Sequence, residues 1–588
     1  MRKILLFTLF CGFISLAQAQ DVFTELADHK VPIVAEWQGV KGIHAAWGTS
    51  NVRYAWHSLP DIKTLKKSET LTAWRGVRVS TQAIVYGAKV TDGLTPITIH
   101  LTPFKNGRHI LPDEAVKASF VRYVKTDSWS TPDGKGAGCG YRPNHSLYDS
   151  AMVADIIDPH VEAIGLDEMS TRSVWVSCQV PSNAVVGTYS GILSVKAGKQ
   201  TIAKLPLHIK VTDHTLPSPR DWDFHLDLWQ NPFAEARYYG TPLWSEAHFA
   251  AMRPSMEMLA AAGQKVITAS IMHKPWNGQT EDHFDSMVTW IKKLDGTWEF
   301  GFDVFDRWVE FMMSCGINKQ INCFSMIPWA LSFPYYDVAT NRMQVLRASP
   351  GDVSYEEMWV AMLKGFSQHL REKGWFDITA IAMDERPMPA MQKAMSVIRK
   401  ADPDFKVSLA GNWHPEIEPD LYDYCIALDQ AELLPQEIFA RRKAEGKKTT
   451  IYTCCSTHKP NTFTFSVPSE AAWYGFYVAG SGYDGYLRWA YNSWVKDPLH
   501  DTRFRQWPAG DTYMVYPYGR SSVRFEKLIE GIQACEKLRI LREEFILSSD
   551  SINLSKLEEL MNRFSANSQY SDDFPSLIQQ GQELLNAF

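Results

Sequence analysis

From about residue 21 to residue 220, hydrophobic and polar residues alternate in short runs. The runs TAWRGVRVSTQAIVYGA, TPITIHLTPF and VWVSCQVPSNAVVGTYSGILSVKAG are separated by Gly, Pro, Asn and Asp. A period of two residues with frequent turn residues predicts short strands, and a Gly-x-Tyr-x-Gly turn, here Gly187 to Gly191, is typical of β-sandwich domains. Residues 20–218 are therefore predicted to form an all-β sandwich, which ends where Pro217 interrupts the pattern.

Beyond Asp221, apolar strands alternate with amphipathic helices. The helical patterns SEAHFAAMRPSMEMLAAAG, FDRWVEFMMSCG and SYEEMWVAMLKGFSQHLREKG end at Gly263, Gly316 and Gly374, as helices commonly do. Repeated strand and helix alternation predicts an α/β fold, a (β/α)8 TIM-like barrel over residues 219–520. The eight predicted strands are 224–230, 265–273, 321–329, 378–385, 406–413, 424–430, 449–456 and 483–494.

Two insertions follow barrel strands, at 274–302 and 330–353, and so lie at the face where such barrels carry their chemistry. The first insertion contains VTWIKKLDGTWEFGF, in which Asp295-Gly296 predicts a hairpin with a two-residue turn. The long helical pattern SSVRFEKLIEGIQACEKLRIL opens the last segment, 521–588, which is predicted to form helices that pack on the barrel.

The composition is that of a soluble globular protein of two or three domains. Of the 588 residues, 45% are apolar and 21% charged, with a formal net charge of −6. This balance argues against nucleic acid or an anionic membrane as a partner. Aromatic residues reach 12%, with 21 Trp, which suits a core and also suits sugars, whose apolar faces stack on such rings.

The first residues, MRKILLFTLFCGFISLAQAQD, have a basic start, an apolar stretch and the small residues Ala17 and Ala19. This pattern predicts a signal peptide, 1–19, and an exported protein, periplasmic or secreted. The bulky Phe10 argues against lipid attachment at Cys11. No later run reaches the roughly 20 apolar residues of a membrane helix, so no integral membrane segment is expected.

Eight cysteines remain after Cys11, an even number that permits disulfides in an oxidising compartment. Several of them lie inside apolar runs, and no Cys or His spacing indicates a zinc site. We therefore expect buried free thiols.

Polar and aromatic residues collect at the carboxyl ends of the predicted barrel strands, where a barrel places its functional groups. No set of three His or Glu is spaced as a metal site and no Gly-rich phosphate loop follows the first strand, so neither a metal nor another cofactor is expected. Acids beside an aromatic wall are the groups that glycoside hydrolysis uses, which predicts an oligosaccharide substrate. The candidate substrate-binding residues are Trp229, His273, Trp329, Asn412, Trp413, His414, Asp429, Tyr452, Trp489, Asn492 and Trp494.

The candidate catalytic residues, Asp384 and Glu385, are adjacent at the end of the run ITAIAMDERP. Retaining and inverting glycosidases separate their two carboxyl groups by about 5 Å or by roughly 6.5–9.5 Å across the sugar, which neighbours on one strand end do not easily do. They suit a mechanism in which the substrate's 2-acetamido oxygen attacks the anomeric carbon. Asp384 would then orient the acetamido group, and Glu385, kept protonated by repulsion, would act as general acid and base.

Three further segments carry a family resemblance: MDERP at 383–387, GYDGYLRWAYNSW at 482–494, and AGDTYMVYP followed by SSVRFEKLIEGIQACEKL within 509–538. With AWRGVRVSTQ and VPSNAVVGTYSGIL in the β-domain, they resemble glycoside hydrolase family 123, the exo-acting β-N-acetylgalactosaminidases. The resemblance implies that Asp384 assists the acetamido group and that Glu385 is the acid/base. It also implies retention of configuration through an oxazolinium intermediate, no metal, and terminal β-linked N-acetylgalactosamine of glycolipid or related glycans as substrate. The chain departs from the family's pattern at 531–535, where GIQAC replaces acidic residues.

Two other interpretations stay open at the level of sequence. The same chemistry could act on β-linked N-acetylglucosamine, since the two sugars differ only in the orientation of O4. The chain could also be a glycan-binding protein without turnover. Its oligomeric state is not indicated by any pattern.

Overall fold

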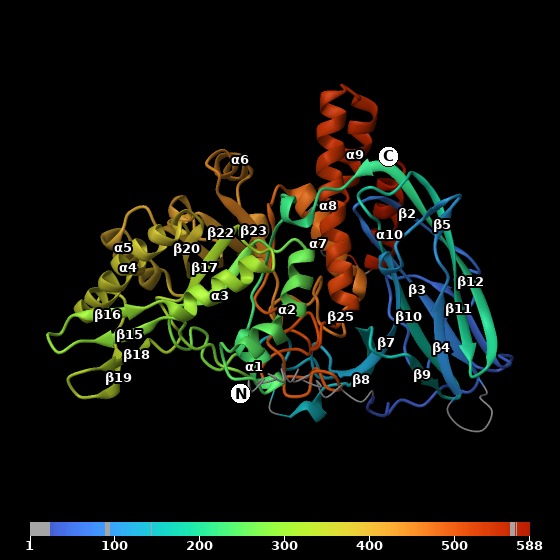
Figure 1. Cartoon of the computed structure of the whole chain (residues 1–588), viewed down its shortest axis with the longest axis horizontal. Helices are drawn as coiled ribbons and strands as arrows, with labels where there is room; N and C mark the ends of the chain where they lie inside the picture. Colours follow the sequence, from blue (N-terminus) through green and yellow to red (C-terminus); the bar gives the residue numbers. More distant parts are fainter. Residues whose placement is uncertain (1–23, 89–94, 143, 565–570, 572) are drawn as a thin grey trace, which may run out of the picture.

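The computed structural model describes residues 24–88, 95–142, 144–564, 571 and 573–588 (Figure 1). The predicted signal peptide and Cys11 lie outside these residues. Among the described residues, no helix has the length and apolarity needed to cross a membrane.

The N-terminal region forms a sandwich of two sheets whose facing sides enclose a core of Trp47, Val85, Val174, Leu193 and Leu207. The pairs are antiparallel except that β12 and β2 are parallel. The first sheet has the order β1 (Ile43–Gly48), β3 (Arg78–Gly87), β10 (Ser170–Gln179), β7 (Val116–Thr126), β8 (Ala151–Asp158) and β25 (Ser521–Ser522). The second has β2 (Glu69–Arg75), β12 (Gln200–Thr215), β11 (Gly187–Ala197), β4 (Thr95–Leu101) and β9 (Ala163–Leu166), with β5 (Lys105–Asn106) and β6 (His109–Ile110) at its side.

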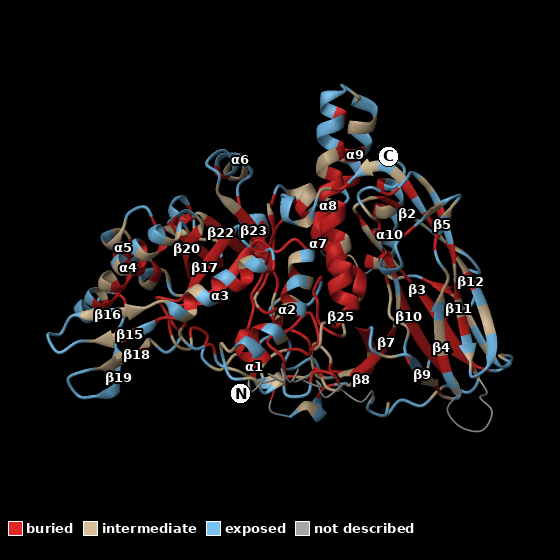
Figure 2. Ribbon diagram, in the orientation of Figure 1, coloured by how far each residue is buried: buried red, intermediate tan, exposed pale blue. Residues whose placement is uncertain are grey.

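The eight predicted barrel strands form one parallel sheet, which confirms the barrel prediction. Their residues are almost all buried (Figure 2). Helices cover the outside of such a parallel barrel, and side chains fill its inside. The strand order is β13 (His225–Leu228), β24 (Gly485–Arg488), β23 (Lys448–Tyr452), β22 (Asp423–Ala427), β21 (Lys406–Gly411), β20 (Thr379–Met383), β17 (Gln320–Phe324) and β14 (Val266–Ser270). The helices are α1 (Pro232–Tyr239), α2 (Glu246–Ala261), α3 (Asp303–Ser314), α4 (Val353–Lys373), α5 (Met388–Ala401), α6 (Gln436–Ala444) and α7 (Pro468–Ser481).

Side-chain amides help to close the barrel between β13 and β14, where the main-chain ladder is reduced to a bridge between Leu226 and Gln264. The Gln264 Oε1 accepts from the Leu228 amide at 2.9 Å, and the Gln230 Oε1 accepts from the Thr268 amide at 2.9 Å. Gln230, one of the residues at the predicted strand ends, is therefore engaged in holding the barrel together.

The two insertions pair with each other in a four-stranded sheet beside the barrel, in the order β16 (Trp298–Gly301), β15 (Thr289–Lys292), β18 (Ser332–Asp337), β19 (Arg342–Arg347) (Figure 1). The prediction of a two-residue turn was wrong. The Lys293 amide bonds to the Thr297 carbonyl, which leaves a three-residue loop, 294–296, with Gly296 at φ 82°. A third residue lets this glycine take the left-handed conformation that closes the hairpin.

The C-terminal segment consists of α8 (Val523–Leu547), α9 (Ser551–Asn562) and α10 (Phe574–Leu585). Helix α8 packs on α7 of the barrel, and β25, just before it, adds to the sandwich sheet beside β8. The two helices approach very closely at Gly475 and Gly531. A Cβ atom on Gly531 would lie 2.3 Å from the Ala472 carbonyl oxygen, so the glycine in the divergent GIQAC stretch is a packing requirement of this crossing.

Cys139 and Cys455 form a disulfide, so the expectation of free thiols was wrong for this pair. The other described cysteines are free, and Cys178, Cys315, Cys323 and Cys425 are buried. The bond joins a loop of the sandwich domain to the loop after β23, across 316 residues of sequence. Only the packing of the two domains brings these loops together.

Buried ion pairs also connect the domains. Asp155 on β8 accepts from Arg524 of α8 and from Arg53, each at 2.9 Å. Burial works to raise the pKa of Asp155, but the two guanidinium groups hold it below its ordinary value. Each charge is thus compensated inside the interface, and the sandwich is held in one orientation against α8 and the barrel.

Candidate active site

The strand β20 delivers the two candidate catalytic acids to the barrel mouth. The residues TAIAM are completely buried, and the chain emerges directly after them at Asp384 and Glu385. The Glu385 amide donates to the Asp384 Oδ1 at 2.8 Å. This local bond turns the Asp384 carboxyl back along the chain, while the Glu385 side chain is exposed to solvent.

Asp384 lies against the loop after β17. Its Oδ2 accepts from the Trp329 indole at 3.1 Å, and the Arg386 guanidinium lies 4.9 Å from the centre of the Trp329 ring. Burial of the carboxyl group and the neighbouring Glu385 raise the pKa of Asp384 to about 6. Asp384 is thus the more deeply buried member of the pair.

Glu385 is held from the opposite direction by Tyr452, at the end of β23. The Tyr452 hydroxyl donates to the Glu385 Oε1. Burial and the charge of Glu385 raise the pKa of Tyr452 well above its ordinary value, so the phenol remains a donor. Gly411 at the end of β21 leaves space beside this carboxylate, since a Cβ there would lie 3.6 Å from the Glu385 Cγ.

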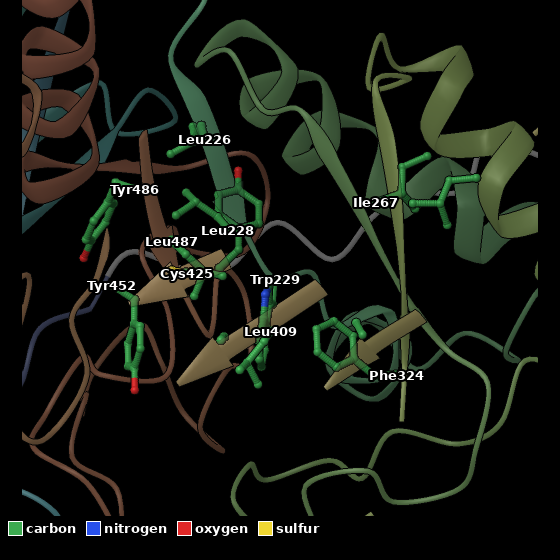
Figure 3. Packing of buried hydrophobic residues seen from close by; sticks show 14 of the residues in the cluster. Leu226, Leu228, Trp229, Ile267, Phe324, Leu409, Cys425, Tyr452, Tyr486 and Leu487 are labelled. Atoms are coloured by element: carbon green, nitrogen blue, oxygen red, sulfur yellow. The ribbon is translucent and has the colours of Figure 1, made fainter. Parts of the chain in front are cut away.

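An aromatic cluster lies at the ends of β13 and β17. Trp229 stacks on Trp276 with 4.9 Å between ring centres and packs against Phe324 at 4.6 Å. Figure 3 shows Trp229 and Phe324 among the residues that fill the barrel interior. Trp229 is only 4% exposed, so it packs as part of the core beneath the mouth.

The loop after β21 carries Asn412, Trp413 and His414, next to the catalytic strand. The Tyr424 hydroxyl orders this loop, because it donates to the Asn412 carbonyl and accepts from the His414 amide, both at 2.6 Å. The Asn412 side chain is exposed, and the rings of Trp413 and His414 are half-buried. Asp429, in the short 3-10 helix after β22, is exposed as well.

Trp489 follows β24 and is supported by a residue that the strand-end argument missed. Its indole donates to the Asp511 Oδ2 at 3.3 Å, and its ring lies edge-on to Trp507. Asp511 is itself paired with Arg488 inside the protein. Because Asp511 belongs to the long segment after β24, no strand signal marked it.

Three other candidates have contacts elsewhere in the fold. Asn492 is buried and donates to Glu235 at 2.8 Å. Trp494 is fully buried and donates to the Val515 carbonyl at 2.8 Å. His273 is half-buried and bonds to Asp285 of the first insertion at 2.8 Å. The first two side chains hold the last βα segment in place and do not reach the surface.

Comparison with protein families identifies the chain. The profile of "Glycoside hydrolase 123, catalytic domain" matches residues 229–541, more than half of the chain, and that of the family's N-terminal domain matches residues 47–197. The protein belongs to glycoside hydrolase family 123. It is therefore a glycosidase, and the paired acids lie within the catalytic domain of the family.

One solved structure agrees with this membership. A family 123 glycoside hydrolase from Clostridium perfringens, described for glycolipid glycan hydrolysis, is 25% identical, with a TM-score of 0.80. The match covers 93% of this chain and 97% of that one. A Bacteroides ovatus GH5 xyloglucanase is 10% identical over 79% of this chain and 98% of its own, with a TM-score of only 0.28. No curated protein matches the chain.

The raised pKa of Asp384 predicts that this family 123 enzyme gives up stability at its active site. The pKa of Asp384 is about 6 in the folded protein, against an ordinary value of 3.8. At low pH the carboxyl group is protonated in both the folded and the unfolded protein, so it does not lower the free energy of unfolding. The cost grows as the pH rises through this interval and is complete above it. Replacing Asp384 by Asn, which can still accept from Trp329, should increase stability at pH 8 by about 1–3 kcal/mol.

Denaturant unfolding of the wild type and Asp384→Asn at pH 8 and pH 4 measures this difference. Most of the gain should be lost at pH 4, just above the ordinary pKa of 3.8. An equal gain at both pH values would show that the charge of Asp384 is not its source.

Proposed function

We propose that the protein is an exported, exo-acting retaining glycosidase that releases terminal β-linked N-acetylgalactosamine from glycolipid-type or related glycans. The observation that carries this proposal is the placement of two acids on one strand end, each with its own donor. Trp329 binds Asp384 and Tyr452 binds Glu385. Family membership favours an enzyme over the glycan-binding alternative.

Asp384 has the surroundings of a residue that assists an acetamido group. Its ionised carboxylate would accept the N–H of the acetamide, so that the amide oxygen points at the anomeric carbon. It would then stabilise the positive charge of the oxazolinium ring, in a partly desolvated site where such interactions are strong. The Trp329 indole keeps the second carboxylate oxygen oriented. Attack by the substrate followed by attack of water inverts the anomeric carbon twice, which gives retention.

Glu385 is suited to proton transfer. Its side chain is exposed at the mouth, where a leaving group and later a water molecule can reach it. In the first step its carboxyl group donates a proton to the leaving oxygen. In the second step the same carboxylate takes a proton from water. The hydroxyl of Tyr452, at the end of β23, fixes the orientation of the Glu385 carboxyl group in both steps.

The sugar identity rests on the resemblance and on the Clostridium perfringens relative, whose description concerns glycolipid glycans. Trp413, His414 and Trp489 are the half-buried rings at the strand ends that could stack on a sugar or its aglycone. Discrimination of N-acetylgalactosamine from N-acetylglucosamine depends on hydrogen bonds to O4, so the glucosaminide activity is the second candidate.

Export predicts that the mature chain begins at Gln20, which the mass of the protein recovered from its source would show.

Paired nitrophenyl β-glycosides test the proposal directly. The galactosaminide should be hydrolysed at least about 10-fold faster than the glucosaminide, the difference that one or two substrate hydrogen bonds supply. NMR of the first product should show the β-anomer. Faster hydrolysis of the glucosaminide would favour the second candidate function, and release of the α-anomer would contradict retention of configuration.

The pKa of Asp384 predicts the acid side of the pH profile. Because Asp384 must be ionised to accept the acetamide N–H, kcat/KM for an N-acetylated substrate should fall as the pH drops below about 6. The Trp329 hydrogen bond stabilises the carboxylate, so Trp329→Phe should move this fall to higher pH. Profiles of both proteins between pH 4 and 8 measure the shift. A midpoint that stays in place or moves to lower pH would contradict the assignment.

A further inference from the structure

A large cleft lies between the sandwich domain and the C-terminal helices. Its volume is about 1060 Å³, just above the range of about 300–1,000 Å³ that is usual for ligand pockets. One wall is built from β2, β3 and the loops around them, and the other from α8 and α10, which stand next to these strands in Figure 1. None of its lining residues comes from the barrel strands.

Uncharged hydrogen-bonding side chains make up much of the lining. They are hydroxyl groups from the sandwich and amides from α10, beside a smaller apolar strip of Leu71, Val77 and Val79. Hydroxyl and amide groups that alternate with apolar surface match a sugar, which presents hydroxyls at its edge and C–H groups on its face. The hydrogen-bonding residues include Thr49, Thr70, Thr72, Ser80, Gln579 and Asn586.

The charged groups of the lining already have partners within the protein, with one exception. Glu530 is paired with Lys527 at 2.6 Å, and Arg78 with Glu526 at 3.2 Å. The same holds for Arg53 with Asp155, Lys66 with Glu69, Asp61 with the Lys63 amide, and Glu583 with the Gln579 amide.

The exception is Lys537 on α8. Its side chain lines the cleft and is only 4% exposed. Among the described residues, no side chain or carbonyl makes a hydrogen bond or an ion pair with its ammonium group; the Trp74 ring lies 5.5 Å away, and the charge of Glu530, another residue of the lining, acts on it as well. Burial lowers the pKa of Lys537 to about 8, so the group still carries its charge at neutral pH. A largely buried ammonium group that makes no hydrogen bond or ion pair is costly, and an anion from outside would lower that cost.

We propose that this cleft binds an acidic saccharide. The carboxylate or sulfate of the sugar would pair with the Lys537 Nζ, and its hydroxyl groups would bond to the hydroxyl and amide side chains of the two walls. The site is separate from the catalytic mouth, so its existence does not depend on the reaction proposed above.

Calorimetric titration of the whole protein tests the proposal. The probes are N-acetylneuraminate, glucuronate and N-acetylgalactosamine 4-sulfate, with neutral glucose as the comparison. At least one acidic probe should bind and glucose should bind at least about 10-fold more weakly, because a charged hydrogen bond is lost. N-acetylneuraminate and glucuronate test binding of a carboxylate, and N-acetylgalactosamine 4-sulfate tests binding of a sulfate.

Variants locate the binding. Lys537→Met should weaken the acidic probe at least about 10-fold and Lys537→Arg should retain it, whereas Lys556→Met, an exposed lysine of α9, should change nothing. Asn586→Trp narrows the cleft at its rim without touching the core and should also weaken binding. Hydrolysis of the nitrophenyl substrate, measured alongside, should be unchanged and shows that each variant is folded. The proposal is overturned if no acidic probe binds, or if an acidic probe binds Lys537→Met as tightly as it binds the wild type.

Discussion

Replacing Glu385 by Gln is expected to lower hydrolysis of a natural, poorly activated N-acetylgalactosaminide by about 10²- to 10⁴-fold, the contribution of a positioned general acid and base. The amide keeps the size of the side chain and its bond from Tyr452, but it has no proton to give to the leaving oxygen. Steady-state kcat and kcat/KM for the wild type and the variant measure the loss.

The choice of leaving group separates the two steps in which Glu385 acts. A dinitrophenol leaves without a proton, so Glu385→Gln should lose much less activity in the first step with this aglycone. Glu416→Gln, an exposed acid on the nearby loop after β21, is the matched control and should behave as the wild type. A similar loss with natural and activated aglycones would argue against general acid catalysis by Glu385.

Removing the acetamido group from the substrate is expected to reduce turnover by about 10³-fold or more. A well-oriented group on the substrate reacts as though it were present at an effective concentration of about 10⁵ M or more. Without it, the acids of β20 provide no nucleophile on the opposite side of the sugar. Rates on the nitrophenyl galactoside and N-acetylgalactosaminide give the ratio. Comparable rates on the two sugars would rule out substrate assistance.

Asp384→Asn tests the same step from the side of the protein. The amide oxygen can still accept the acetamide N–H, but it carries no charge to stabilise the oxazolinium ring, so we expect a loss of about 10²- to 10³-fold on N-acetylated substrates. A thiazoline that imitates the intermediate should inhibit the wild type strongly and bind the variant more weakly. Equal inhibition of both proteins would contradict the role of Asp384.

Much of the barrel could be predicted from sequence because its signals are local. Each strand is a short apolar run bounded by turn residues, and a period of two or of 3.6 residues does not depend on distant contacts. The same holds for Asp384 and Glu385, which are conspicuous because two acids follow the buried run TAIAM. Trp329 and Tyr452 could be placed near them because the ends of parallel strands meet at one face.

Other features of the site could not be predicted from the residues at the strand ends. Asn492 and Trp494 carry the right chemistry at the right end of β24, but they point into the fold, where Glu235 and Val515 receive their hydrogen bonds. The direction of a side chain after a strand depends on the loop that follows it. The support of Trp489 by Asp511 is likewise a contact between loops.

The sequence by itself determined the order and type of the secondary structure, the parallel barrel and the pair of acids at its mouth, since periodicity and adjacency are properties of the chain. Tertiary structure alone decided that the pKa of Asp384 is raised, because its carboxyl group is buried only once the loop that carries Trp329 has folded against it. It also decided the disulfide between Cys139 and Cys455 and the burial of Lys537 in the wall of the interdomain cleft. These are contacts between segments hundreds of residues apart, and they exist only once the two domains have packed.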